Sequence, residues 1–402
     1  LAEINRFKGE VMTIRAYHYI KLAMLFGDVP LITSGINIEE GRNITRTPVT
    51  EVWDFIENEL DQAADWLPYD NAPGRIAKGA ALGLKARGML FAKRYSQAVE
   101  AAQELISSNE FSLYPDYFEL FQYGGQYNAE ILLDRQRARD VNAHNIYTML
   151  APWSQISGST GSLYVPTAKM IDLYEMENGM AIQDPASGFD PENPYQNRDS
   201  RLYQSVFLSG ITPLPDGGVY GSTPNTDGSD AVQITVYSTS TGFNVRKYID
   251  DEDYNNPSNS GLNIILLRYA EVLLTYAEAK VEMGELDQSV YDALNAVRQR
   301  PSVEMPPINS EEGHSQEELR EIIRKERTVE LAFEGLRLFD LRRWEVAEQE
   351  IPGIPKGMTY VEEGEIKQVE LPGFERNFDP NRDYLWPIPQ RERELNTNLT
   401  QN

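Results

Sequence analysis

Residues 326–344 read ERTVELAFEGLRLFDLRRW, and this stretch places charged side chains among large apolar ones. On a helix, Glu326, Glu330 and Glu334 recur every four residues and share one face. Arg327 lies three residues before Glu330, and Arg337 lies three residues after Glu334. An anion-binding site would leave its arginines unpaired, whereas carboxylates and guanidinium groups alternate here. We therefore interpret the stretch as structural framework, with ion pairs formed along the helix.

The bulk composition narrows the possible functions. At 402 residues the chain can bury a large core, and length alone suggests two or three domains. A formal net charge of −25 argues against nucleic acid and against unaided adsorption to anionic lipid. The sequence has no apolar run of about 18 residues, the length that a membrane-spanning helix needs. It also has no cysteine, which excludes disulfides, zinc–thiolate sites and cysteine nucleophiles.

Helical patterning dominates both ends of the chain. Residues 48–67 carry the i, i+3, i+4 apolar spacing of an amphipathic helix. Residues 81–106 and 272–297 resemble each other when shifted by 191, and small residues recur at matching positions: Ala86 with Ala277, Ala98 with Ser289, and Ala102 with Ala293. Small residues at this spacing let two antiparallel helices approach closely, as in tetratricopeptide repeats. We predict tetratricopeptide-like helical hairpins.

The middle of the chain has a different composition. Residues 110–260 are rich in Gly, Pro, Ser, Asn and Tyr, with short strand-like pieces at 130–136, 201–208 and 242–249. The sequence therefore predicts a mainly α protein: helical hairpins over 1–110, a loop-rich ligand-binding region with short strands over 111–260, and C-terminal helices with a docked tail over 261–402. Long loops on a compact domain are typical of binding regions.

We find no catalytic constellation in the sequence. His18 and His314 lack a metal-ligand partner at i+3 or i+4, and no HExxH, GxSxG, P-loop or GxGxxG pattern occurs. Two acidic runs alternate as calcium ligands do: Asp251, Asp253 and Asn255, and Asp379, Asn381 and Asp383. Both runs lack the glycine and the distal glutamate of an EF-hand, so we interpret them as solvated loops. We predict neither a metal nor a cofactor.

The opening stretch closely resembles the C-terminal signature of the SusD/RagB family. Three further segments resemble that family in the same order: RAYHYIKLAMLFGDVPLI (15–32), LLRYAEVLLTYAEAKVEMGE (266–285) and YLWPIPQRERELNTNLTQN (384–402). The resemblance implies that residues 1–402 form a single SusD-like domain. Members of this family carry an N-terminal lipoprotein signal and an acylated cysteine, which this chain lacks. Because residues 3–26 begin inside a helical pattern, we expect the natural N-terminus to lie upstream.

The resemblance implies a function without catalysis. It implies a surface-exposed lipoprotein of the Gram-negative outer membrane that captures a glycan, or in some members a peptide or glycopeptide. It further implies delivery of that ligand to a SusC-like TonB-dependent transporter. A scaffold of tetratricopeptide-like hairpins holding a peptide or protein partner is the alternative, and a glycoside hydrolase is a third possibility. Aromatic side chains on the middle loops would favour a sugar receptor, whereas aromatics along a helical groove would favour the scaffold.

A sugar ring needs an aromatic platform and polar partners for its hydroxyls. Trp153 lies in MLAPWSQISGSTGS (149–162), outside the predicted helices and the family signatures that contain the other four tryptophans. We therefore predict that Trp153 stacks on the ligand. Secondary candidates lie in the same loops: Tyr147, Tyr164, Tyr220, Asn142 and Gln155.

Overall fold

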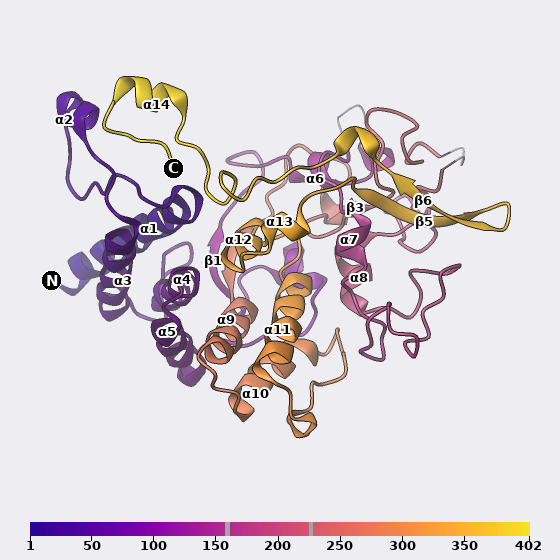
Figure 1. The fold of residues 1–402 in the computed structure, drawn as a ribbon, viewed down its shortest axis with the longest axis horizontal. Helices are drawn as coiled ribbons and strands as arrows, with labels where there is room; N and C mark the ends of the chain where they lie inside the picture. The colour runs from indigo at the N-terminus through magenta and orange to yellow at the C-terminus, as the bar shows by residue number, and fades with distance from the viewer. Residues whose placement is uncertain (157–160, 225–227) are drawn as a thin grey trace.

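The computed structural model describes residues 1–156, 161–224 and 228–402, and it is mainly helical, as the sequence predicts (Figure 1). Five helices form the N-terminal section: α1 (Ala2–Phe26), α2 (Ile38–Asn43), α3 (Val49–Trp66), α4 (Lys78–Phe91) and α5 (Tyr95–Ser108). The C-terminal section contains α9 (Tyr269–Glu282), α10 (Gln288–Arg298), α11 (Gln316–Glu330), α12 (Arg337–Arg343), α13 (Ala347–Glu350) and α14 (Gln390–Leu395). In the described parts of the chain, no helix is both long enough and apolar enough to span a bilayer.

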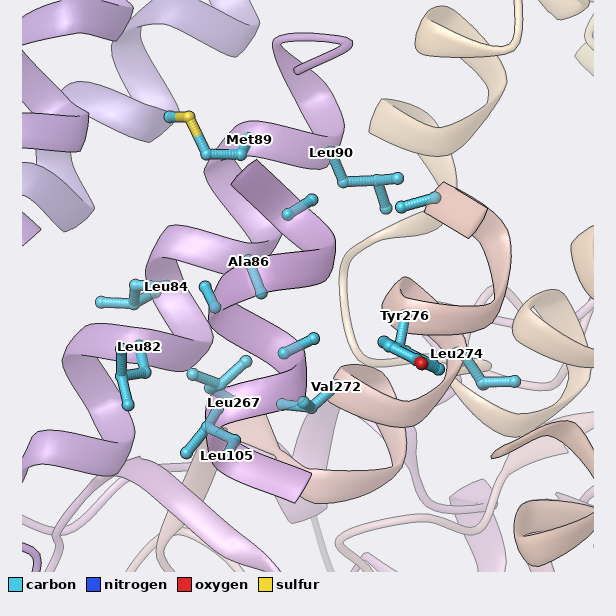
Figure 2. Close-up of a cluster of buried hydrophobic side chains, with 14 of the residues drawn as sticks. Leu82, Leu84, Ala86, Met89, Leu90, Leu105, Leu267, Val272, Leu274 and Tyr276 are labelled. Atoms are coloured by element: carbon cyan, nitrogen blue, oxygen red, sulfur yellow. The ribbon is translucent and has the colours of Figure 1, made fainter. Parts of the chain in front are cut away.

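The helical core joins these two sections. Helix α4 packs against α3, α5 and α9, and α9 packs in turn against α10 and α11. Figure 2 shows side chains of α4 and α9 with Leu105 and Leu267 in one apolar cluster. Gly83 lets α4 approach Leu267 closely, because a Cβ there would lie 2.6 Å from Leu267 Cδ2. Ala86, Ala98 and Ala102 are all buried, which agrees with the close helix packing expected from their spacing.

The middle section contains short elements between long loops. They are α6 (Ile146–Leu150), α7 (Ala168–Ile171), α8 (Ser200–Ser205), β1 (Ile131–Arg135), β2 (Val206–Phe207) and β3 (Asn244–Val245). β1 pairs antiparallel with β4 (Ile264–Arg268), and β2 pairs with β3. The strand predicted at 130–136 is confirmed, but most of 201–208 is helix α8. Asp199 caps that helix by accepting a hydrogen bond from the Arg201 amide at 2.9 Å.

A third two-stranded sheet, which is a hairpin, and the C-terminal tail complete the fold. β5 (Lys356–Glu362) and β6 (Glu365–Glu370) flank Glu363–Gly364, which both adopt positive φ, as a tight two-residue hairpin turn requires. The tail returns to the N-terminal helices (Figure 1), where the Trp386 amide donates to Leu25 O at 2.7 Å and Asn396 Nδ2 donates to Ile44 O at 2.7 Å. These hydrogen bonds hold the tail against the N-terminal section.

The stretch 326–344 is buried framework, but its ion pairs differ from those the helical spacing predicts. Helix α11 ends at Glu330, and a turn with positive φ at Phe333 and Gly335 leads to α12. The three glutamates pair with side chains from other segments: Glu326 with Arg201 and Arg298, Glu330 with Arg201, Arg268 and Arg300, and Glu334 with Arg268 and Lys247. This face of α11 points into the protein interior, so distant arginines supply the countercharges.

Candidate functional site

Trp153 lies on a short turn held at the edge of a small apolar core. The chain leaves α6 and forms one 3-10 turn, η3 (Trp153–Gln155), in which the Gln155 amide donates to Pro152 O at 3.0 Å. Ala151 and Ile156, on either side of this turn, are buried in the same apolar cluster as Phe207. These flanking residues anchor the turn while the indole between them stays partly exposed.

Two further contacts determine the position of the Trp153 backbone. The Ser154 amide donates to Asp230 Oδ1 at 2.9 Å, which ties the turn to a second loop. Burial raises the pKa of Asp230, and the hydrogen bonds from Ser154 oppose this shift. On the other side, Gly161 approaches so closely that a Cβ there would lie 3.1 Å from Trp153 Cα. A larger residue at position 161 would therefore displace the turn.

A second aromatic ring extends the Trp153 surface. The Tyr237 and Trp153 rings are stacked, with centroids 6.2 Å apart and an interplanar angle of 26°. Tyr237 is 42% exposed. Its loop is stabilised by side-chain hydroxyls of the loop itself: Thr235 Oγ1 accepts a hydrogen bond from the Tyr237 amide at 3.2 Å. We call these two stacked rings the aromatic pair. Both residues of the aromatic pair remain partly exposed.

An open hollow lies along the loop that carries Tyr237, and neither ring of the aromatic pair is among its lining residues. It has a volume of about 680 Å³, and one wall is the 233–240 loop that carries Tyr237. The opposite wall is the end of β6 and the turn η6 (Pro372–Phe374), where Phe374 is 63% exposed. Ser238, Ser240 and Gln233 line the hollow together with Ile234 and Val236. Hydroxyl and amide groups thus alternate with apolar surface, as recognition of a polyhydroxylated ligand requires.

Of the other predicted residues, Tyr164 and Asn142 lie at the surface. Tyr164 is 64% exposed, and its neighbour Leu163 donates its amide to Met149 O at 2.9 Å, which keeps this segment beside α6. The Asn142 amide is occupied within its own loop: its Oδ1 accepts from the Ala138 amide at 2.7 Å and its Nδ2 donates to Gln136 O at 3.3 Å. Asn142 therefore shapes a turn.

The structure corrects the expectation for three residues, which are buried rather than presented on a loop. Tyr147 and Tyr220 belong to the apolar core beneath the Trp153 turn, and Tyr220 donates its hydroxyl to Asn244 Oδ1 at 2.9 Å. Gln155 is also buried, with its Nε2 donating to Ser154 Oγ at 3.0 Å. None of the three has an open face for a ligand. Sequence position near Trp153 did not distinguish the core side of the loop from the open side.

Sequence reasoning missed Tyr237 and Phe374. Tyr237 lies in a Ser/Thr-rich run, TVYSTSTG (235–242), which is the same kind of setting that singled out Trp153. Phe374 follows a Pro-Gly turn, and its exposure follows from that turn. The sequence around Tyr237 does not indicate that its ring contacts Trp153, because the two residues lie more than 80 positions apart in the chain.

The acidic runs considered for calcium serve local structure. Asp253 Oδ1 accepts from Tyr123 OH and from Arg139 Nη2, both at 2.9 Å. Asp379 and Asp383 accept hydrogen bonds from backbone amides of their own turn. Across residues 1–156, 161–224 and 228–402, no group of three or more His, Asp or Glu side chains is arranged to hold a metal ion.

Two family profiles match the chain and together cover most of it. Residues 129–402 match the SusD family, a span that contains the buried framework of α11 and the aromatic pair. The chain belongs to the SusD family. Residues 2–90, which cover α1 to α4, match a second SusD-like profile described as "Starch-binding associating with outer membrane".

Individual SusD-like proteins agree with this assignment. The chain is 30% identical to SusD-like protein P2 of Formosa agariphila, over all of this chain and 74% of that protein. Among solved structures it is similar to a SusD-like carbohydrate binding protein from Bacteroides fragilis, with 29% identity and a TM-score of 0.89 over all of this chain and 80% of that one. A second SusD-like protein from the same organism has 30% identity and a TM-score of 0.84, with the same two coverages. The helical framework is thus the SusD framework.

Proposed function

We propose that this SusD-family chain binds a glycan without cleaving it, and that the aromatic pair is its main contact. The observation that carries this proposal is the stacked Trp153 and Tyr237, both partly exposed on loops of the middle section. An open hollow runs along the loop that carries Tyr237. We propose Tyr164 and Phe374, whose side chains are both exposed, as further contacts. The similarity of this chain to a SusD-like carbohydrate binding protein supports the same ligand class.

The physical basis is the chemistry of a sugar ring. One face of a pyranose presents C–H groups, and laying it on an indole removes apolar surface from water at about 25 cal/mol per Å². The ring edge carries hydroxyls, which the side chains of Gln233, Ser238 and Ser240 in the hollow are suited to meet. Asp230 is the carboxylate hydrogen-bonded to this turn, and its Oδ1 accepts the Ser154 amide. We assign Asp230 a positioning role rather than a catalytic one.

The cellular part of the proposal rests on the family. We propose an outer-membrane location, a lipid anchor upstream of Leu1, and delivery of the glycan to a SusC-like TonB-dependent transporter. The matched description of association with the outer membrane supports the location. In this scheme residues 111–260 hold most of the ligand contacts, while 1–110 and 261–402 supply the helical scaffold and the docked tail.

A helical scaffold for a peptide or protein partner is the competing function. It requires exposed aromatics along a groove between the helices, whereas Trp153 and Tyr237 lie on loops of the middle section. The position of the aromatic pair therefore favours a glycan receptor.

The test is affinity electrophoresis in gels that contain amylopectin, xylan, laminarin, alginate or pectin. The native chain should be retarded by at least one polysaccharide, without release of reducing ends. Trp153→Ala and Tyr237→Ala should each weaken retardation about tenfold or more, since removal of an aromatic anchor costs about 2 kcal/mol. Ile38→Ala removes an exposed apolar side chain on α2 and serves as the control. Retardation that neither aromatic substitution weakens would refute the site, and no retardation in any gel would refute the function.

A further inference from the structure

A groove that is separate from the hollow lies between the helical hairpins and β1. It has a volume of about 590 Å³. One wall is the loop 69–77 that connects α3 to α4, and the other is the segment 127–136 that leads into and includes β1. None of its lining residues lines the hollow beside Tyr237. Any ligand in this groove would therefore bind independently of the first site.

Tyr127 at the mouth of the groove has an unusual combination of properties. Its side chain is 66% exposed, and its backbone has φ of 60°, a left-handed conformation that is unfavourable for a bulky residue. The segment around it is fixed: Asn128 Oδ1 accepts the Glu130 amide at 2.7 Å, and Gln126 Oε1 accepts the Asn263 amide at 2.9 Å. Among the described residues, no ring or cation packs on the Tyr127 ring. The fold thus holds an exposed aromatic ring in a strained position without an internal contact to explain it.

Aromatic side chains continue into the groove. The Tyr69 and Phe111 rings meet edge to face with centroids 6.3 Å apart, and Phe111 lies nearly parallel to Tyr269 at 6.4 Å. Lys78 Nζ lies 5.2 Å from the Tyr69 ring centroid and limits its movement. The groove therefore has a preformed apolar floor, and binding would require little reorganisation of it.

The polar groups of the groove favour a neutral ligand. Asp70, Asp134 and Gln136 lie along it, and carboxylate and amide groups are suited to hydroxyls. Its arginine, Arg75, is already paired with Glu10, with Nε 3.0 Å from Oε1, and lies 4.9 Å from the Phe7 ring centroid. No free cation of the groove is therefore available for a sulfate or a uronate, and the carboxylates would repel one.

From these features we infer that the groove is a second sugar-binding site, which takes a neutral saccharide chain with Tyr127 as its stacking platform. This inference rests on the proposed glycan-binding function. Two independent sites on one chain raise the apparent affinity for a long polysaccharide, because the second contact becomes intramolecular once the first has formed. A short oligosaccharide that fills one site gains nothing from the other. The groove would thus favour capture of polymers.

The decisive substitution is Tyr127→Gly, because it separates binding from folding. Glycine removes the ring and also accepts the left-handed backbone, so the melting temperature should stay the same or rise. Retardation by whichever neutral polysaccharide retains the native chain, among amylopectin, xylan and laminarin, should weaken about tenfold. Tyr127→Phe keeps the ring and should behave like the native chain. Combining Tyr127→Gly with Trp153→Ala should abolish retardation.

Each result has a defined consequence. Retardation of Tyr127→Gly equal to that of the native chain overturns the second site while leaving the proposed function intact. A native chain that no polysaccharide retards overturns both. If Tyr127→Gly is retarded like the native chain but no longer binds casein-derived peptides that the native chain binds, the groove is a peptide site and the inference is also overturned.

Discussion

Arg268 and Glu330 form a fully buried ion pair that joins the last residue of β4 to the last residue of α11, with Nη1 2.7 Å from Oε1. Burial by itself raises the pKa of Glu330, but Arg268, Arg300 and Arg201 outweigh burial and hold that pKa below its usual range. The backbone carbonyl of Glu330 accepts further hydrogen bonds from Tyr117 OH and Lys247 Nζ. Glu330, the last residue of α11, is therefore linked to strand β4 through Arg268 and to the middle section through Arg201 and Lys247.

Removing the Glu330 charge should destabilise the fold strongly. In Glu330→Gln, three guanidinium groups lose a shared countercharge in the interior, and breaking a buried pair costs about 3–5 kcal/mol. Glu321→Gln, on the same helix, loses an exposed pair with Arg324 and should change the free energy of unfolding by less than about 1 kcal/mol. Urea unfolding of both variants gives the comparison. Equal stability of the two variants would contradict a role of Glu330 as a central countercharge.

Acid should destabilise the protein through the same carboxylates. Glu326, Glu330 and Glu334 all have a pKa lowered from the ordinary value of 4.5. A carboxyl with a lowered pKa contributes stability above its unfolded pKa and loses it as pH falls through the folded pKa. The free energy of unfolding should therefore fall steadily below about pH 4.5.

Other carboxyl groups act against this loss of stability at low pH. The contribution of Glu330 must therefore be measured as a difference between the native chain and a variant. Burial raises the pKa of Asp134, Asp172 and Asp230, and these groups favour the folded state as they become protonated. Subtracting the unfolding free energies of Glu330→Gln from those of the native chain, across a pH series, isolates the Glu330 contribution. That difference should shrink as pH falls. A difference that stays constant down to about pH 3 would refute the conclusion that Glu330 stabilises the fold through its lowered pKa.

Arg327 and Arg337, both in the stretch 326–344, should differ in their effect on stability. Arg327 is fully buried, with Nε 2.9 Å from Asp340 Oδ2, so Arg327→Ala should cost about 3–5 kcal/mol. Arg337 is partly exposed: it donates to Thr328 Oγ1 at 2.8 Å and lies 3.5 Å from Glu350, so Arg337→Ala should cost about 1 kcal/mol. Thermal melting of both variants measures the difference. Glycan affinity per folded molecule should be unchanged in each, and a loss of affinity in folded Arg337→Ala would give this residue a binding role.

Local sequence patterns predicted the helices well because apolar spacing and small residues report directly on close helix packing. The burial of 326–344 was also predictable, since charged residues alternate there with large apolar ones. The partners were not: Glu330 pairs with Arg201, Arg268 and Arg300, which come from α8, β4 and the chain after α10. The same limit applies to the site. Trp153 was chosen as a candidate from its loop setting, but its contact with Tyr237 and the burial of Tyr147 and Tyr220 depend on tertiary packing.

Asp230 offers a test of how the Trp153 turn is positioned. Its Oδ1 accepts the Ser154 amide at 2.9 Å, next to the indole but not part of the aromatic surface. Asp230→Asn keeps an oxygen acceptor at that place and should preserve glycan retardation. Asp230→Ala leaves the Ser154 amide without this partner, and loss of one such hydrogen bond costs about 0.5–1.5 kcal/mol, so affinity should fall about threefold to tenfold. The melting temperature should change little, because the helical core does not depend on this contact. Rescue by asparagine separates a positioning hydrogen bond from a requirement for negative charge: equal losses in both variants would show that the carboxylate charge itself acts on the ligand.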